Sequence, residues 1–263
     1  MRRCVVSRAW RVGVILVLFL GCRSGTEPAR QTLTIAAAAS LTDVFRDLEA
    51  GFEAQHPELD VQFIFAGSQV LRWQIEAGLA ADVYASADPR EMQGLQESGL
   101  VSEPVSIATN SLAVVYRQDE MGPMADLSDL LLVPAWVLGV EGSPIGRYTE
   151  TLLNRVEGDI GASFRDRIHQ KVVSYEKNVR VLRSKVALGV VPAAMVYASD
   201  VTSVDGLQGF ILPASVQPDI RYPIAVVSSS QHPNAARLWI SFVQSKTAQD
   251  RWTSHGFPAG DAP

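Results

Sequence analysis

Residues 33–48 read Leu33-Thr-Ile-Ala-Ala-Ala-Ala-Ser40-Leu-Thr-Asp-Val-Phe-Arg-Asp-Leu48, and this stretch decides the fold. A short apolar run typical of a buried strand leads into four alanines, and apolar residues then recur at helical spacing from Leu41 to Phe52. Ser40 stands at the position of a helix N-cap, so the stretch predicts a strand, a tight turn and a helix. Small side chains let a ligand approach the backbone of such a turn, and free N–H groups at the helix start favour an anion.

The first 21 residues have the pattern of a secretory signal peptide. Four arginines precede an apolar run from Val12 to Leu20, which is too short to span a bilayer. The run Phe19-Leu20-Gly21-Cys22 resembles a lipoprotein signal, in which Cys22 becomes the lipidated first residue of the mature chain, although the pattern prefers leucine to Phe19. An ordinary signal peptide cleaved nearby is the alternative. Residues 22–31 are polar and predict a tether between lipid and folded domain in the periplasm or cell envelope.

Composition excludes several classes of protein. Removal of the signal peptide takes away four arginines and no acidic residue, so the formal net charge changes from −5 to −9. Such an acidic protein is a poor candidate for binding nucleic acid. The chain holds two cysteines, and Cys4 leaves with the signal, so the mature domain has no disulfide and no cysteine-based metal site. The four histidines are scattered, with no two at the spacing of metal ligands.

Strand and helix patterns alternate from Thr32 onward. The predicted strands cover 61–66, 82–87, 111–116, 135–140, 194–198 and 222–228, and the predicted helices cover 68–77, 89–97, 145–155, 179–188, 234–244 and 247–255. This alternation predicts an α/β fold with parallel strands, whose ligands sit beyond the carboxyl ends of the strands.

The late strand and helices indicate that the chain returns to its first half. We therefore expect two lobes joined by two crossings, near residues 107–111 and 219–223. Lobe 1 is predicted to comprise residues 32–108 plus 223–263, and lobe 2 residues 109–222.

Four predicted turns share one arrangement. Ser40 and Ser68 each precede a helix in the first lobe, while Ser143-Pro144-Ile145-Gly146 and Asn178 open helices in the second. If the lobes face each other, four helix N-termini converge on one cleft, and the hydroxyl of Tyr197 at the end of a buried strand joins them.

Nine motifs run in a fixed order across nearly all of the mature chain. They are Ala37-Ala-Ala-Ser-Leu41, Phe65-Ala-Gly-Ser68, Gln74-Ile-Glu-Ala-Gly78, Ala81-Asp-Val-Tyr-Ala-Ser-Ala-Asp88, Asn110-Ser-Leu112, Pro144-Ile-Gly-Arg-Tyr148, Asn178-Val-Arg180, Val196-Tyr-Ala-Ser-Asp200 and Tyr222-Pro-Ile-Ala225. With these motifs the chain closely resembles the molybdate-binding proteins of bacterial ABC importers, the ModA family of extracellular solute-binding proteins.

This resemblance implies a two-lobed periplasmic-binding-protein fold with the ligand in the cleft. It also implies a monomer that is not an enzyme and has no cofactor, and that delivers molybdate or tungstate to an ABC permease in the cytoplasmic membrane. In the family the oxyanion is held by residues matching the hydroxyls of Ser40, Ser68 and Tyr197 and the backbone N–H groups of Ile145 and Val179. Ile145 stands where the family often has alanine, and Gly67 replaces a serine of some members.

Other ligands and one other activity remain as alternatives. A receptor of the same architecture for sulfate, phosphate or ferric iron is the nearest, although iron receptors cluster tyrosines with carboxylates and this cleft offers chiefly one tyrosine. Ser174-Tyr-Glu-Lys177 matches the S-x-x-K spacing of penicillin-recognising serine acyl-enzymes. Ser174 ends an apolar run, however, and Asn178 is the better cap for the helix that follows. Asp82 and Asp88 are expected to be structural.

Overall fold

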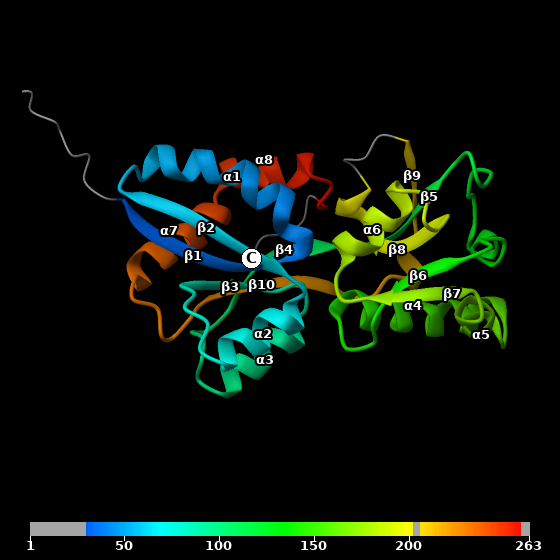
Figure 1. The fold of residues 1–263 in the computed structure, drawn as a ribbon, viewed down its shortest axis with the longest axis horizontal. Coiled ribbons are helices and arrows are strands. Elements are labelled where there is room, and N and C mark those ends of the chain that lie inside the picture. Colours follow the sequence, from blue (N-terminus) through cyan, green and yellow to red (C-terminus); the bar gives the residue numbers. More distant parts are fainter. Residues whose placement is uncertain (1–29, 202–205, 259–263) are drawn as a thin grey trace, which may run out of the picture.

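The computed structural model describes residues 30–201 and 206–258, and it shows two α/β lobes side by side along the long axis of the molecule (Figure 1). The predicted signal peptide, Cys22 and most of the predicted tether lie outside the described residues. Within those residues no helix combines the length and apolar character that crossing a membrane requires.

The first lobe is built on a five-stranded sheet of order β2-β1-β3-β10-β4. Its strands are β1 (Gln31–Ala38), β2 (Leu59–Ala66), β3 (Val83–Ala85), β4 (Val105–Asn110) and β10 (Ile220–Val226). Its helices are η1 (Ala39–Leu41), α1 (Thr42–Gln55), α2 (Ser68–Glu76), α3 (Pro89–Glu97), α7 (Pro233–Val243) and α8 (Lys246–Ser254).

Alternation along β1 divides the core of this lobe between the two faces of the sheet. Leu33 and Ile35 are buried against α1, α7 and α8, where the rings of Phe45 and Trp239 meet edge to face at 5.3 Å. Ala36 belongs to a separate cluster on the other face, under α2 and α3. The aromatic helices predicted near the end of the chain therefore return to the first lobe.

The second lobe has a five-stranded sheet of order β7-β6-β8-β5-β9. Its strands are β5 (Leu112–Arg117), β6 (Trp136–Gly139), β7 (Val172–Glu176), β8 (Ala193–Tyr197) and β9 (Leu207–Ile211). Its helices are η2 (Leu127–Leu131), α4 (Pro144–Ile160), α5 (Phe164–His169), α6 (Val179–Ala187), η3 (Ala198–Asp200) and η4 (Ala214–Val216).

Both sheets are mixed, so the expectation of parallel strands is only partly correct. β1 pairs in parallel with β2 and β3, and β6 with β7 and β8. β10 is antiparallel to β3 and β4, and β5 is antiparallel to β8 and β9. The reason is the connection between lobes: β5 and β10 carry the chain away from the junction, while β1, β3, β6 and β8 end there.

The two crossings lie two and three residues from the predicted boundaries. The chain changes sheets between Asn110 and Leu112, and it re-enters the first sheet at Ile220. The predicted boundaries at 108/109 and 222/223 fall inside β4 and β10, which pair through Ile220 opposite Asn110 and Tyr222 opposite Ala108. Asn110 and Tyr222 therefore belong to the sheet of the first lobe, at the hinge.

The predicted tether, residues 22–31, is wrong at its C-terminal end. Gln31 already pairs with Leu59 in the first sheet, and the Arg30 guanidinium forms an ion pair with Glu53 at 2.8 Å. Arg30 also donates to the carbonyl of Pro57 at 3.1 Å. Neither residue is apolar, so the hydrophobic pattern gave no indication that this segment joins the lobe.

Candidate functional site

A small cavity of about 20 Å³ lies where the two lobes meet. All five residues predicted to bind the ligand line it, two from the first lobe and three from the second. The lining residues are Ala38, Ala39, Ser40, Gly67, Ser68, Ala87, Ser143, Pro144, Ile145, Lys177, Asn178, Val179 and Tyr197.

Ser40 reaches the cavity by a different local structure from the one predicted. It does not cap α1, because the 3₁₀ turn η1 separates β1 from that helix and Leu41 occupies the N-cap position without a side-chain bond. The Thr42 hydroxyl instead donates to the Ala39 carbonyl at 2.7 Å. The Ser40 hydroxyl is thereby free of the backbone, and its oxygen accepts a hydrogen bond from the Tyr222 hydroxyl at 3.2 Å.

Ser68 is the first residue of α2, after Gly67 at the N-cap. Its hydroxyl oxygen accepts from the backbone N–H of Ala87 at 3.0 Å, and the residue is 1% exposed. A Cβ at position 67 would lie 2.6 Å from the carbonyl oxygen of Lys177 in the other lobe. Glycine in place of the serine of some family members therefore lets the two lobes approach closely at this point.

Two helices of the second lobe direct their N-termini at the cavity, and both predicted caps are confirmed. The Gly146 N–H donates to the Ser143 hydroxyl at 3.1 Å, with Pro144 opening α4, and the Val181 N–H donates to Asn178 Oδ1 at 3.2 Å. Since the caps take up later N–H groups, those of Ile145 and Val179 have no acceptor in the described part of the chain.

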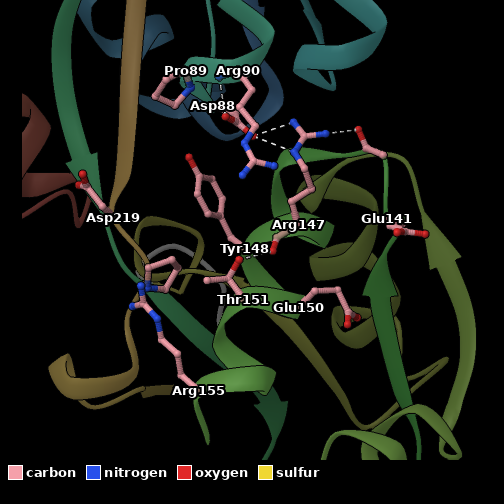
Figure 2. Close-up of a pocket in the computed structure, with 12 residues that line it drawn as sticks. Asp88, Pro89, Arg90, Glu141, Arg147, Tyr148, Glu150, Thr151, Arg155 and Asp219 are labelled. Carbon is pink, nitrogen blue, oxygen red and sulfur yellow. Dashed lines mark hydrogen bonds and ion pairs between the residues drawn. The ribbon is translucent and has the colours of Figure 1, made fainter.

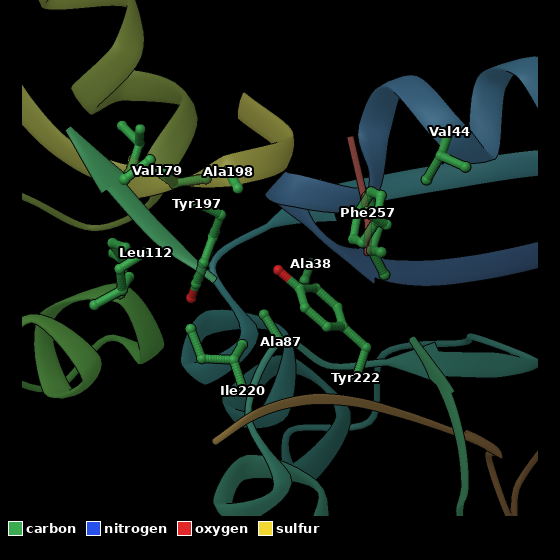
Figure 3. Packing of buried hydrophobic residues seen from close by; sticks show 14 of the residues in the cluster. Ala38, Val44, Ala87, Leu112, Val179, Tyr197, Ala198, Ile220, Tyr222 and Phe257 are labelled. Atoms are coloured by element: carbon green, nitrogen blue, oxygen red, sulfur yellow. The ribbon is translucent and has the colours of Figure 1, made fainter. Parts of the chain in front are cut away.

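The Tyr197 hydroxyl completes the set. Tyr197 is the last residue of β8. Its hydroxyl is fully buried and has no hydrogen-bond partner among the residues that the structure describes. The Tyr197 ring lies edge to face against the Tyr222 ring, at 6.1 Å between centroids (Figure 3). It lies in the same way against the Tyr148 ring, at 6.5 Å. Burial raises the pKa of Tyr197 well above its usual value, so the group stays a neutral donor. An orphaned buried hydroxyl costs free energy unless something binds it.

The lobes are also joined by an arginine on one side of the cavity. Arg147 on α4 contacts Asp88 Oδ2 through Nη2 at 2.6 Å and through Nε at 3.0 Å (Figure 2). It also contacts Glu91 Oε1 through Nη2 at 2.5 Å. Both acidic side chains belong to the first lobe and are almost fully buried. This ion pair borders a larger pocket of about 830 Å³, which Tyr148 also lines.

Further polar contacts bridge the lobes at α6. Arg180 forms an ion pair with Asp43 at 2.7 Å and donates to the carbonyl of Ala39 at 3.1 Å. Burial of Asp43 opposes ionisation, but the hydrogen bond and charge of Arg180 outweigh it and lower the pKa of Asp43. Gln69 Nε2 donates to the Lys177 carbonyl at 2.9 Å. The described structure is therefore a closed arrangement of the lobes.

Asp200 is a buried carboxyl group beside this junction. Its Oδ1 lies 4.0 Å from Arg180 Nε, and it is 2% exposed. Burial raises the pKa of Asp200 to about 6, against the opposing charges of Arg180 and Arg183.

Asp82 and Asp88 have structural contacts, as the sequence predicts. Asp82 accepts from the Thr34 N–H at 2.8 Å and from the Ser230 hydroxyl at 2.6 Å. Asp88 caps α3 by accepting from the Arg90 N–H at 2.8 Å, in addition to its contact with Arg147. That contact was not predicted, since 59 residues separate the partners.

The serine of the S-x-x-K match lies in β7 and does not open a helix. Its hydroxyl accepts from Lys185 Nζ at 2.9 Å, while Asn178 caps the helix that follows. In the described ranges no three His, Cys, Asp or Glu side chains are close enough to hold a metal ion.

The arrangement can bind an anion by hydrogen bonds alone. Three hydroxyl groups and two N–H groups converge from both lobes, and those at the N-termini of α4 and α6 carry the partial positive charge of the helix ends. Lys177 is the only ionisable side chain among the described lining residues apart from Tyr197. Such donors fit a compact oxyanion.

Comparison with known proteins agrees with this geometry. The family described as bacterial extracellular solute-binding protein matches residues 33–258. The chain is 30% identical over 237 residues to the molybdate-binding protein ModA of Mycobacterium tuberculosis (strain H37Rv), covering 89% of this chain and 87% of that protein. It is 28% identical over 256 residues to YvgL of Bacillus subtilis, a proposed ABC transporter substrate-binding lipoprotein, covering 92% and 94%.

Solved structures agree on the two-lobed fold. The periplasmic molybdate-binding protein of Azotobacter vinelandii superposes with a TM-score of 0.76 at 16% identity, covering 87% of this chain and all of that one. The sulfate-binding protein SubI of M. tuberculosis superposes with a TM-score of 0.77 at 18% identity, covering 87% and 86%. By the match over residues 33–258, the chain belongs to the bacterial extracellular solute-binding protein family, the solute-binding components of ABC importers.

Proposed function

We propose that this protein captures molybdate or tungstate between its lobes and delivers the oxyanion to an ABC permease in the cytoplasmic membrane. The observation that carries the proposal is the cavity itself. The residues proposed to supply the donors, Ser40, Ser68, Ile145, Val179 and Tyr197, line it from both lobes of one chain. Because one chain supplies the whole site, we also propose that it acts as a monomer. The ModA relatives, which are described as molybdate-binding proteins, support the same ligand.

Neutral donors suffice to hold a dianion in such a site. Helix N-termini place partial positive charge on N–H groups already aimed at the cavity, so orienting them costs nothing further on binding. The formal net charge of −9 expected after loss of the four signal-peptide arginines repels an anion at long range. Salt screens the interactions inside a buried site only weakly, and these interactions favour the anion. The long-range repulsion therefore lowers mainly the rate at which the anion associates with the protein.

Size is the proposed source of selectivity among dianions. Sulfate is a smaller tetrahedron than molybdate, so it cannot reach donors of both lobes at hydrogen-bonding distance. Each buried donor left unpaired costs about 1–3 kcal/mol. Two such losses amount to roughly a hundredfold in affinity or more. The fold alone does not discriminate, because a sulfate-binding protein shares it.

Competitive calorimetry tests the ligand. Molybdate and tungstate are expected to bind with similar affinity, because the two oxyanions have nearly the same size and charge. Sulfate and phosphate are expected to be weaker by about a hundredfold or more, and ferric iron is expected not to bind. Sulfate binding as tight as molybdate binding would contradict the proposed ligand while leaving the solute-binding family intact.

We further propose that lipid on Cys22 anchors the protein to the cell envelope. The run Phe19-Leu20-Gly21-Cys22 supports this, as does similarity to a relative described as a lipoprotein. Metabolic labelling with a fatty acid is expected to mark the wild-type protein, and Cys22→Ala is expected to abolish both the label and the association with membranes. Equal labelling of the two proteins would refute the anchor.

A further inference from the structure

We infer that Tyr222 and Asn110, neither of which lines the cavity, set which protonation state of an oxyanion the site accepts, by making Ser40 a hydrogen-bond donor. This inference rests on the proposed oxyanion site and extends it to specificity. The evidence is a chain of four polar groups running from the hinge to the cavity, the last three of them in buried residues, in which each bond has a defined direction.

The direction is set at the hinge, at the first crossing between the lobes. The backbone N–H of Ser111 donates to Asn110 Oδ1 at 2.9 Å. A backbone N–H can only donate, so the oxygen of this amide must face Ser111, and Nδ2 must face the opposite way. Asn110 is 6% exposed, which leaves its amide little access to water as an alternative partner.

The amide then orients the hydroxyl of Tyr222. Asn110 Nδ2 lies 3.2 Å from the Tyr222 hydroxyl oxygen and 2.9 Å from the Ser199 hydroxyl. An amide nitrogen has no acceptor capacity, so the Tyr222 oxygen accepts and its hydrogen is left to donate. The acceptor within reach is Ser40 Oγ, at 3.2 Å. Burial raises the pKa of Tyr222 far above its usual value, so this hydrogen is retained.

Ser40 is thereby left with one hydrogen to place. Its oxygen receives the bond from Tyr222, and no described residue accepts the Ser40 hydroxyl hydrogen. The remaining direction is the cavity that Ser40 lines. Ser68 is oriented in the same way. The backbone N–H of Ala87 donates to its hydroxyl oxygen at 3.0 Å, so the Ser68 hydroxyl also has its hydrogen left to donate. Both serines of the first lobe therefore offer hydrogens, and the N–H groups of Ile145 and Val179 offer hydrogens by their nature.

This polarity distinguishes oxyanions by their protons. Molybdate, tungstate and sulfate carry no proton at neutral pH, so every oxygen accepts a hydrogen bond. Phosphate keeps at least one proton. If a P–OH group faced Ser40, its hydrogen and the hydroxyl hydrogen of Ser40 would point at each other, and neither would have an acceptor. Leaving such a buried group unpaired is unfavourable. Sulfate and phosphate have similar size. The ratio of their affinities therefore depends on the protonation state of the oxyanion and not on the dimensions of the cavity.

The test is calorimetry of molybdate, sulfate and inorganic phosphate binding to the wild-type protein and to Tyr222→Phe. The variant keeps the ring that packs on Phe257 at 5.6 Å but cannot donate to Ser40, whose hydroxyl is then free to rotate and accept. The ratio of the sulfate affinity to the phosphate affinity is expected to be about tenfold smaller in the variant than in the wild-type protein. The matched control is Tyr148→Phe, which removes a hydroxyl beside Tyr197 outside the chain of bonds and is expected to leave the preference unchanged.

Three further measurements make the outcome decisive. Asn110→Ala removes the group that orients Tyr222, so it is expected to narrow the preference in the same direction. In a Ser40→Ala background, Tyr222→Phe is expected to change the preference no further, because the effect passes through Ser40. Melting temperatures report folding separately. A loss of structure would weaken all three oxyanions together and leave their ratios unchanged.

The two proposals fail differently. A wild-type protein that binds no molybdate would overturn the proposed function. A wild-type protein that binds molybdate, with the ratio of sulfate to phosphate affinity unchanged in both Tyr222→Phe and Asn110→Ala, would overturn the role of the hinge residues and leave that function standing.

Discussion

Replacing Val179 by proline is expected to weaken molybdate binding about ten- to a hundredfold while helix α6 stays folded. The proposed contact of Val179 is its backbone N–H, which proline lacks. Val179 is the first residue of α6, where proline is well tolerated because this N–H makes no bond within the helix. Asn178 before it has φ −154° and ψ 160°, the extended conformation that proline requires of its predecessor. A hydrogen bond to a charged group contributes about 1.5–3 kcal/mol, which corresponds to the expected loss.

Val179→Ala is the matched control. Val179 is 3% exposed, so both substitutions remove buried apolar surface, but alanine keeps the N–H. Calorimetry should therefore show near-wild-type molybdate affinity for the alanine variant and a large loss for the proline variant. Circular dichroism and thermal unfolding check that α6 remains intact in both. Equal affinities of the two variants would remove Val179 from the proposed site.

Tyr197→Phe is expected to weaken molybdate binding by a similar factor, about ten- to a hundredfold. The Tyr197 hydroxyl is buried and lacks a partner in the described residues, so its hydrogen is available to an anion in the cavity. The same fact predicts a second result. Because the hydroxyl makes no described bond within the protein, its removal should not lower the melting temperature of the ligand-free form.

The two results together separate a binding role from a structural one. Tyr148→Phe is again the control, since Tyr148 packs on the Tyr197 ring and lines the larger neighbouring pocket instead of the cavity. It should leave molybdate affinity unchanged. Wild-type affinity in Tyr197→Phe would show that the tyrosine does not contact the ligand. A lower melting temperature without any change in affinity would indicate a purely structural hydroxyl.

The Val179 and Tyr197 predictions both depend on the closed arrangement of the lobes. The cavity exists between groups of both lobes, which are held together by Arg147 with Asp88 and Glu91 on one side and by Arg180 with Asp43 on another. None of these charged groups lines the small cavity. These ion pairs thus stabilise the closed arrangement from outside the cavity, while the five proposed ligand donors are neutral.

Helix starts in this protein could be predicted from local sequence because their chemistry is local. Helix α3 has the predicted bounds, Pro89–Glu97, since Asp88 before Pro89 supplies a cap and a residue preset for the first turn. Ser143 and Asn178 cap their helices as predicted, for the same reason. The five candidate ligand residues were found through family motifs, and the helix-start patterns at Ser68, Ile145 and Val179 agree with them.

Elements without a one-sided apolar pattern were missed. Strands β7 and β9 lie at opposite edges of the second sheet, and all of their residues are only partly buried or exposed. An edge strand packs on one neighbour only, so its sequence carries a weaker signal. Strand β4 was not predicted either, and its N-terminal residue Val105 is exposed.

The sequence by itself determined the alternation of strands and helices, the bounds of α3, the caps of α4 and α6, and the family, because each rests on residues close together in the chain. Only the tertiary structure decided the antiparallel direction of β5 and β10, the contact of Arg147 with Asp88, and the hydrogen bond between Tyr222 and Ser40. Ser40 reads locally as a helix cap, yet its partner Tyr222 stands 182 residues away. Folding brings that hydroxyl to the hinge, and a hydrogen bond over such a separation leaves no local pattern.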